Sequence, residues 1–240
     1  MVVWVFSGGG EAEVRGFFPF LEKTFPGCRF ERKTPVSRKP GPKSNKANSE
    51  GRTGKSLIEE IKQELAIALK AEPNKCDLIL VFDDLDCRDS QKQKEKIEET
   101  WSEISKIPEC ADIEKFVGFA APEIEAWIIA DWNNSIAKHS DFRGRHERMR
   151  WWLSYEKNVP FDSPESFSEY DAEKDCCREK LSEALVESSV QDEVDRDKAR
   201  FSKGIHTPLL LMAIDPNEVQ KKCPLFRELY NYLKNFCRSS

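Results

Sequence analysis

The sequence predicts an α/β protein with a mostly parallel sheet flanked by helices, followed by a helical C-terminal extension. Two observations carry this prediction. Short, continuous apolar runs alternate with amphipathic stretches as far as about Asn133, and beyond that point only helical patterns recur. Strands that alternate with helices form parallel sheets covered on both faces. We therefore expect an α/β core over residues 1–135 and a mainly helical extension over 136–240, packed on that core.

The expected strands are apolar and rich in β-branched or aromatic residues, and the expected helices place apolar residues three and four positions apart. The strands are expected at Val2–Phe6, Asp77–Phe82 and Ile113–Phe119, and the helices at Glu11–Thr24, Ser56–Lys70, about 90–106, and from Ala121 onward. Pro122 suits the first turn of that last helix, where its missing N–H costs nothing. Prolines and glycines over 35–54 predict a loop.

The net charge argues against a protein that binds nucleic acid through a globally basic surface. It is -5, and the sequence pI is about 5.5, whereas such proteins carry a basic surplus. One segment departs from this balance, because residues 29–55 hold nine basic and two acidic residues. That segment is either a solvated loop or an arm that contacts phosphates. The candidate nucleic-acid contacts are Arg38, Lys39, Lys43, Arg52, Lys55 and, further along, Lys203.

The cysteines and the N-terminus indicate a cytoplasmic protein that does not enter a membrane. None of the eight cysteines forms a Cys-x-x-Cys pair, and no histidine lies at zinc-finger spacing from one. The apolar run at the N-terminus is six residues long, too short for a signal peptide. No run approaches the ~20 residues that span a bilayer. We therefore expect reduced, mostly structural thiols in a reducing cytosol.

Acidic residues follow the second and third expected strands, where open α/β sheets bind their ligands. Side chains alternate along an extended segment, so Asp84 and Asp86 are expected on the same side, with Asp83 pointing away. Two carboxylates on one side suit Mg²⁺, which prefers oxygen ligands. The alternative is that these residues simply end the strand and cap the next helix.

Glu123 and Glu125 follow the third strand and are further candidate metal ligands. On a regular helix, residues two apart lie ~200° apart around the axis, so only one of them would face a given site. If the helix begins after Glu123, either residue is a candidate ligand. The sequence leaves this choice open.

The order of these motifs resembles the Toprim domain of topoisomerases, primases and overcoming-lysogenization-defect nucleases. More specifically, four stretches are similar to a small stand-alone Toprim-like family of prokaryotic proteins with unassigned function. They are Gly8–Val14 with Phe18–Leu21, Asp84-Leu85-Asp86, Glu123–Asp131, and the tail from Lys203 through Cys223-Pro224-Leu225-Phe226. In Toprim enzymes the first strand ends in a catalytic glutamate followed by glycine. Here Ser7 stands at the matching position before Gly8, and the second family glutamate matches Glu11.

The resemblance implies a nuclease dependent on Mg²⁺ or Mn²⁺ that hydrolyses phosphodiesters in DNA or RNA, within a phage- or mobile-element-defence system. Glu11, Asp84 and Asp86 would be catalytic, and with Glu123 or Glu125 they would hold the metal. Ser7 favours an alternative, a catalytically degenerate module that binds a partner ATPase or nucleic acid. A third hypothesis uses the glycines at 8–10 as an anion cradle for a nucleotide or small effector.

Overall fold

The computed structural model describes residues 1–8, 11–34, 55–72, 75–104, 113–191 and 198–238. The chain divides into two compact units. Unit 1 comprises Met1–Asp83, Ser90–Gly118 and Leu233–Ser240, and unit 2 comprises Asp84–Asp89 and Phe119–Tyr232. No helix within the described ranges is long and apolar enough to cross a membrane.

The sheet is parallel and has four strands in the order β2-β1-β3-β4, which confirms the predicted fold class. The strands are β1 (Val2–Ser7), β2 (Arg29–Thr34), β3 (Leu78–Asp84) and β4 (Glu114–Ala120). The two central strands carry the core: Val3–Phe6 and Leu78–Phe82 are buried throughout. Their continuous apolar sequence is therefore that of strands covered on both faces.

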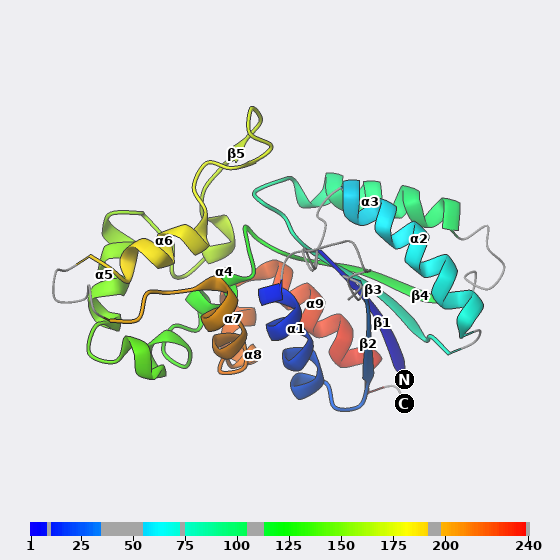
Figure 1. The fold of residues 1–240 in the computed structure, drawn as a ribbon, viewed down its shortest axis with the longest axis horizontal. Coiled ribbons are helices and arrows are strands. Elements are labelled where there is room, and N and C mark those ends of the chain that lie inside the picture. Colours follow the sequence, from blue (N-terminus) through cyan, green and yellow to red (C-terminus); the bar gives the residue numbers. More distant parts are fainter. Residues whose placement is uncertain (9–10, 35–54, 73–74, 105–112, 192–197, 239–240) are drawn as a thin grey trace, which may run out of the picture. The chain divides into compact units, whose positions relative to one another are not determined.

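Three helices connect the strands: α1 (Glu11–Thr24), α2 (Lys55–Ala71) and α3 (Ser90–Ile104). The chain passes from β1 to β2 in one direction and then returns past β1 to β3. Because such crossovers are right-handed, the helices of the two directions cover opposite faces. Figure 1 shows this arrangement, with α2 and α3 together on one side of the sheet and α1 on the other. Phe17 of α1 stacks on Phe82 of β3 with ring centroids 3.9 Å apart.

β2 was missed within the basic segment 29–55. It pairs with β1 at the sheet edge, with Val3 opposite Phe30. Of its six residues, Phe30 and Thr34 are buried, and the others are charged. Charged side chains are common on edge strands, where they hinder pairing with another chain. Over Arg29–Thr34, the charges that were interpreted as a solvated loop or a phosphate-contacting arm are therefore those of a sheet edge.

Ser7 links the carboxyl end of β1 to β2. Its hydroxyl donates to the backbone oxygen of Thr34 at 3.3 Å, and the Thr34 hydroxyl donates to the backbone oxygen of Ser7 at 3.2 Å. Both residues are buried. The Ser7 hydroxyl thus joins two strands within unit 1.

Two disulfides contradict the expectation of reduced thiols for four cysteines. Cys28 is bonded to Cys237 within unit 1, and Cys87 to Cys177 within unit 2. The first bond joins positions 209 residues apart. Close packing accompanies it, because a Cβ on Gly27 would lie 2.6 Å from the Cys237 backbone oxygen. Sequence spacing could not reveal these pairs, since none of them is local.

Unit 2 is built around the buried helix α4 (Glu125–Ala130). Its other helices are α5 (His146–Tyr155), α6 (Leu181–Ser188), α7 (Lys203–Leu211), α8 (Pro216–Lys222) and α9 (Pro224–Phe236), whose last turn falls in unit 1. Short elements connect them: η2 (Ile136–Lys138), η3 (Ser140–Phe142), η4 (Pro164–Ser166), β5 (Tyr170–Asp171) and β6 (Cys176–Cys177). α6, α7, α8 and η4 all contact α4.

Glu165 of η4 gives unit 2 a pH-dependent contact. Its carboxylate accepts the backbone N–H groups of Leu225 and Phe226 at the start of α9, at 2.9 and 3.0 Å. Burial nevertheless raises the pKa of Glu165 from 4.5 to about 7. The folded state therefore binds a proton more tightly than the unfolded chain. This stabilisation is fully present below pH 4.5 and is lost as the pH rises to about 7.

We expect the free energy of unfolding to fall by at most ~3 kcal/mol from this group as the pH rises from 4.5 to 7. Urea denaturation across this range measures it. Glu165→Gln should flatten the pH dependence, whereas Glu169→Gln, which changes an exposed glutamate paired with Arg178, should leave it unchanged. A slope of the same size in all three proteins would contradict the assignment to Glu165.

Candidate functional site

Three carboxylates of unit 2 converge on one ammonium group. The Lys203 Nζ lies 3.4 Å from Glu123 Oε1, 3.5 Å from Glu125 Oε2 and 3.8 Å from Asp84 Oδ2. The carboxylate side chains are 0–8% exposed, and the Lys203 side chain is 33% exposed. We call these four residues the acidic cluster. It brings together three of the five predicted metal ligands.

Backbone hydrogen bonds align the segments that carry these carboxylates. Asp84 is the last residue of β3, and its Oδ1 accepts the backbone N–H of Ile124 at 3.1 Å. Beyond it, the backbone N–H of Leu85 donates to Ala120 and that of Asp86 to Pro122. The chain after β3 therefore runs beside the chain after β4. This is the meeting of strand ends on which the prediction rested.

Both glutamates contact Lys203, which differs from the expectation that only one would face a site. The expected helix start at Ala121 is wrong, because α4 begins at Glu125. Glu123 precedes the helix, so the 200° separation of a regular helix does not apply to this pair. The conditional alternative, a helix that begins after Glu123, therefore holds.

Hydroxyl and backbone donors orient the two glutamates further. Ser182 at the start of α6 donates to Glu123 from its backbone N–H at 2.9 Å and from its hydroxyl at 2.9 and 3.0 Å. Thr207 of α7 donates its hydroxyl to Glu125 Oε1 at 2.7 Å. Buried carboxylates need such donors to offset the loss of water. Sequence reasoning missed both residues, because neither lies in a recognisable motif.

Lys203 was predicted as a nucleic-acid contact and is found among carboxylates. It is the first residue of α7, where the helix dipole disfavours a positive charge. A lysine at this position is therefore held there by its three acidic neighbours rather than by the helix. An unfavourable charge at a helix start was the available sequence signal for such a role.

Asp86 takes a different position from Asp84. The strand ends at Asp84, and Asp86 lies in a turn with φ of +47°, followed by Cys87 with φ of +61°. Its carboxylate pairs with Arg88 at 3.1 Å. The alternation that was expected to place Asp84 and Asp86 on one side does not extend through this turn. The disulfide of Cys87 with Cys177 and the Arg88–Asp175 ion pair hold the same turn.

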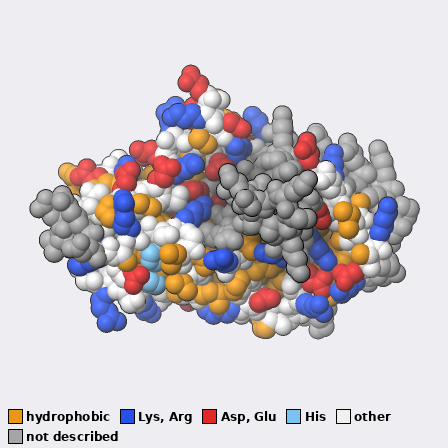
Figure 2. Space-filling view, viewed as in Figure 1, with side chains coloured by type: hydrophobic (Ala, Val, Ile, Leu, Met, Phe, Trp, Pro, Cys, Tyr) orange, Lys and Arg blue, Asp and Glu red, His pale blue; other side chains and the backbone are white. Residues whose placement is uncertain are grey.

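The side chains of the remaining predicted site residues lie outside the described part of the structure. Glu11 opens α1 and Lys55 opens α2, but their side chains lie outside the described part of the structure. Arg38, Lys39, Lys43 and Arg52 fall within 35–54, also outside it. On the face drawn in Figure 2, the described basic and acidic side chains are interspersed. The proposed nucleic-acid arm therefore stays a prediction.

Fold and site define an α/β protein with a four-stranded parallel sheet and, in unit 2, a buried acidic cluster beyond β3 and β4. The chain belongs to the family that shares a domain of unknown function, DUF4276, which matches residues 30–234. No curated protein and no solved structure matches the chain. The family description assigns no activity and names no Toprim domain, so that resemblance also stays a prediction.

Proposed function

We propose that the protein is a divalent-metal-dependent nuclease that hydrolyses phosphodiester bonds in DNA or RNA. The observation that supports this function best is the convergence of Asp84, Glu123 and Glu125 within 3.8 Å of one ammonium group. When all four groups are ionised, the acidic cluster carries a formal charge of −2. A buried excess of negative charge is costly unless a cation balances it.

The donor set fits Mg²⁺ or Mn²⁺. All three groups offer carboxylate oxygens, the ligands that these hard cations prefer, and one divalent ion would neutralise two of their three negative charges. A bound cation would lower the pKa of its water and neutralise charge on the phosphate. Ser182 and Thr207 would keep Glu123 and Glu125 oriented toward it, as the hydrogen-bonded partners of ligands do.

Lys203 would have two roles in this function. Without a metal, its ammonium neutralises part of the acidic cluster. With a metal bound, repulsion between the two cations would turn the lysine toward solvent, where it could contact a phosphate oxygen. Its partial exposure allows this movement. The predicted nucleic-acid contact and the observed ion pairs are then two states of one residue.

The alternative function is a binding module without catalysis that partners an ATPase or nucleic acid, within the same defence setting. Ser7 supports it, because the Toprim glutamate is replaced by a hydroxyl that bonds Thr34 in the sheet. Lys203 also supports it, since a cluster that already contains a cation has less need of a metal. This version predicts no tight binding of Mn²⁺.

Titration of the purified protein with Mn²⁺ in a calorimeter separates the two functions. We expect one ion per chain, and removing one of the three carboxylates (Asp84→Asn or Glu125→Gln) should weaken the affinity ~10-fold or more. The same variants should lose cleavage of single-stranded and plasmid substrates. Glu147→Gln, which changes an exposed glutamate of α5, is the matched control. Cleavage that survives in Asp84→Asn would remove the acidic cluster from the mechanism.

A further inference from the structure

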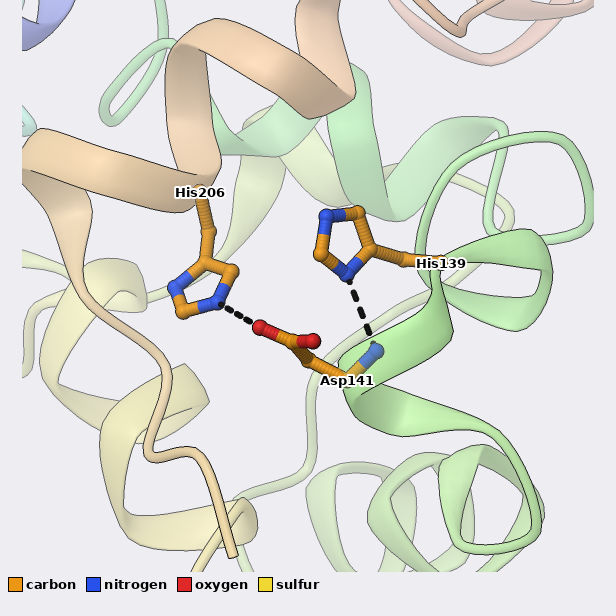
Figure 3. Close-up of side chains that lie close together, drawn as sticks. All are labelled: His139, Asp141 and His206. Carbon is orange, nitrogen blue, oxygen red and sulfur yellow. Dashed lines mark hydrogen bonds and ion pairs between the residues drawn. The ribbon is translucent and has the colours of Figure 1, made fainter.

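A second cluster of polar side chains in unit 2 includes a residue of α7, the helix that carries Lys203. It consists of His139, Asp141 and His206, whose side-chain ligand atoms lie within 4.8 Å of one another (Figure 3). The His206 ring is 3% exposed, and the rings of Phe142 and Phe201 lie 4.9 and 5.5 Å from it. Two histidines and a carboxylate are a common metal donor set, so metal binding is the first function to consider for this cluster.

The hydrogen bonds argue against a metal at this place. His206 Nδ1 accepts the backbone N–H of Ser202 at 2.8 Å, and His139 Nδ1 accepts that of Asp141 at 3.3 Å. A neutral ring whose Nδ1 accepts carries its hydrogen on Nε2. Histidines that bind a metal through Nε2 have the opposite arrangement, with Nδ1–H as a donor. In His206, Nε2 instead faces Asp141 Oδ2 at 3.3 Å and donates to it.

His206 therefore hydrogen-bonds both to the residue before α7, Ser202, and to Asp141, which lies on a different element. Ser202 is the N-cap of α7, and no backbone carbonyl of that helix can accept its N–H. His206 Nδ1 accepts this N–H in the manner of a capping box. Through Nε2, the same ring ties α7 to Asp141 in η3. The first turn of α7 is thus fixed by one hydrogen bond to its own N-cap and by one to η3.

This turn sets the position of the groups that face the acidic cluster. Lys203 and Thr207 are four residues apart on α7, so they lie on one side of the helix. Lys203 contacts all three carboxylates, and Thr207 donates to Glu125. His206 lies between them in sequence and bonds to a different element. Its two hydrogen bonds therefore fix the helix against which the cluster is assembled.

We propose that His206 and Asp141 are a positioning pair that holds Lys203 among the carboxylates and so sets how readily a divalent cation replaces it. The part concerning Lys203 rests on the contacts alone, whereas the part concerning the cation rests on the proposed function. Loss of the pair loosens the first turn of α7, frees the ammonium and lets Mn²⁺ compete more easily. Neither His206 nor Asp141 touches the metal or the substrate.

The test measures the acylation rate of Lys203 in the metal-free, full-length protein by peptide mass spectrometry, with Lys221 as the internal reference. A lysine held in ion pairs reacts slowly. In His206→Ala, which loses both hydrogen bonds, we expect Lys203 to react about twofold to tenfold faster, the range that corresponds to one lost hydrogen bond. Mn²⁺ affinity, measured separately, should rise by a similar factor.

Two conservative variants and one control sharpen the result. His206→Asn places an acceptor near the position of Nδ1, and His206→Gln places a donor near that of Nε2, so each should restore part of the slow rate. His146→Ala, on α5, should behave as wild type. If His206→Ala does not fold, Asp141→Ala provides a second measurement, because it removes the acceptor of the His206 Nε2–H and the Asp141 side chain is 41% exposed.

The outcomes separate this inference from the proposed function. Faster labelling with unchanged Mn²⁺ binding keeps the positioning pair and counts against the metal site. An unchanged labelling rate in a folded His206→Ala or Asp141→Ala protein overturns the pair. Stoichiometric binding of Zn²⁺ or Co²⁺ that is lost in both His139→Ala and Asp141→Asn also overturns it, because the cluster would then be a metal site.

Discussion

Replacing Lys203 with methionine should destabilise the protein by about 3 kcal/mol when no divalent cation is present. The change keeps the aliphatic stem and removes the charge that faces Asp84, Glu123 and Glu125. Three largely buried carboxylates then lose the ammonium that faces them, and removing one partner of a buried ion pair is strongly destabilising. We take the lower end of that range because the lysine itself is one-third exposed.

Adding a divalent metal should restore most of the stability that Lys203→Met loses. Without the competing ammonium, the acidic cluster should bind Mg²⁺ or Mn²⁺ more tightly. At ~100 times the dissociation constant, bound metal adds ~2.7 kcal/mol and so offsets most of the loss. Urea denaturation in EDTA and in excess Mg²⁺ measures both quantities on one protein.

Lys221→Met is the matched control. Lys221 pairs with Glu218 on the surface of α8, and exposed pairs of this kind contribute less than ~1 kcal/mol. Its stability should be close to wild type with and without metal. If Lys203→Met is as stable as wild type in EDTA, the three carboxylates do not need a cation. If it is unstable but indifferent to Mg²⁺, the lysine is a structural counter-ion and the alternative binding function gains support.

The three carboxylates of the acidic cluster were predictable from the sequence because they follow predicted strands. Asp84 and the 123–125 glutamates follow continuous apolar runs, and parallel strands bring such ends to one edge. Asp86 was misplaced because a turn with positive φ replaces the extended backbone on which the alternation argument depends. Turn geometry of this kind leaves little trace in residue type when the turn contains no glycine.

Contacts between segments distant in sequence account for most of what was missed. Ser182 and Thr207 lie 59 and 82 residues from the glutamates they bond. Hydroxyl residues are common throughout the chain, so only the folded arrangement selects these two. β2 was missed for a different reason: four of its six residues carry charges suited to an edge, and periodicity detects buried faces. The fold class was robust because it rests on the two central strands.

Removing the disulfide between Cys28 and Cys237 is the second change with a large expected effect. The bond joins residues 209 apart and ties the start of β2 to the end of the chain, within unit 1. Cross-links across long loops restrict the unfolded chain strongly, and native disulfides typically contribute about 2–4 kcal/mol. We expect Cys28→Ser with Cys237→Ser to lose that amount relative to the oxidised wild type.

A reductant provides the decisive comparison. The reductant also opens the bond between Cys87 and Cys177 in both proteins, so in its presence the wild type and the double variant should be indistinguishable in urea denaturation. Cys76→Ser serves as the control. Burial raises the pKa of the Cys76 thiol to about 12, so this thiol stays protonated and unreactive, and its substitution should not change the response to reductant.

The redox midpoint of this response also bears on where the protein works. Structural disulfides persist in oxidising compartments and are reduced in a typical cytosol, where the sequence placed the protein. A midpoint below about −300 mV would mean that the glutathione pool cannot open the bond, so a cytoplasmic location and an intact disulfide are compatible. A higher midpoint would mean that unit 1 loses the cross-link in the cytosol. If the double variant without reductant is as stable as the wild type, Cys28 and Cys237 are not bonded, and the expectation of reduced thiols holds for this pair.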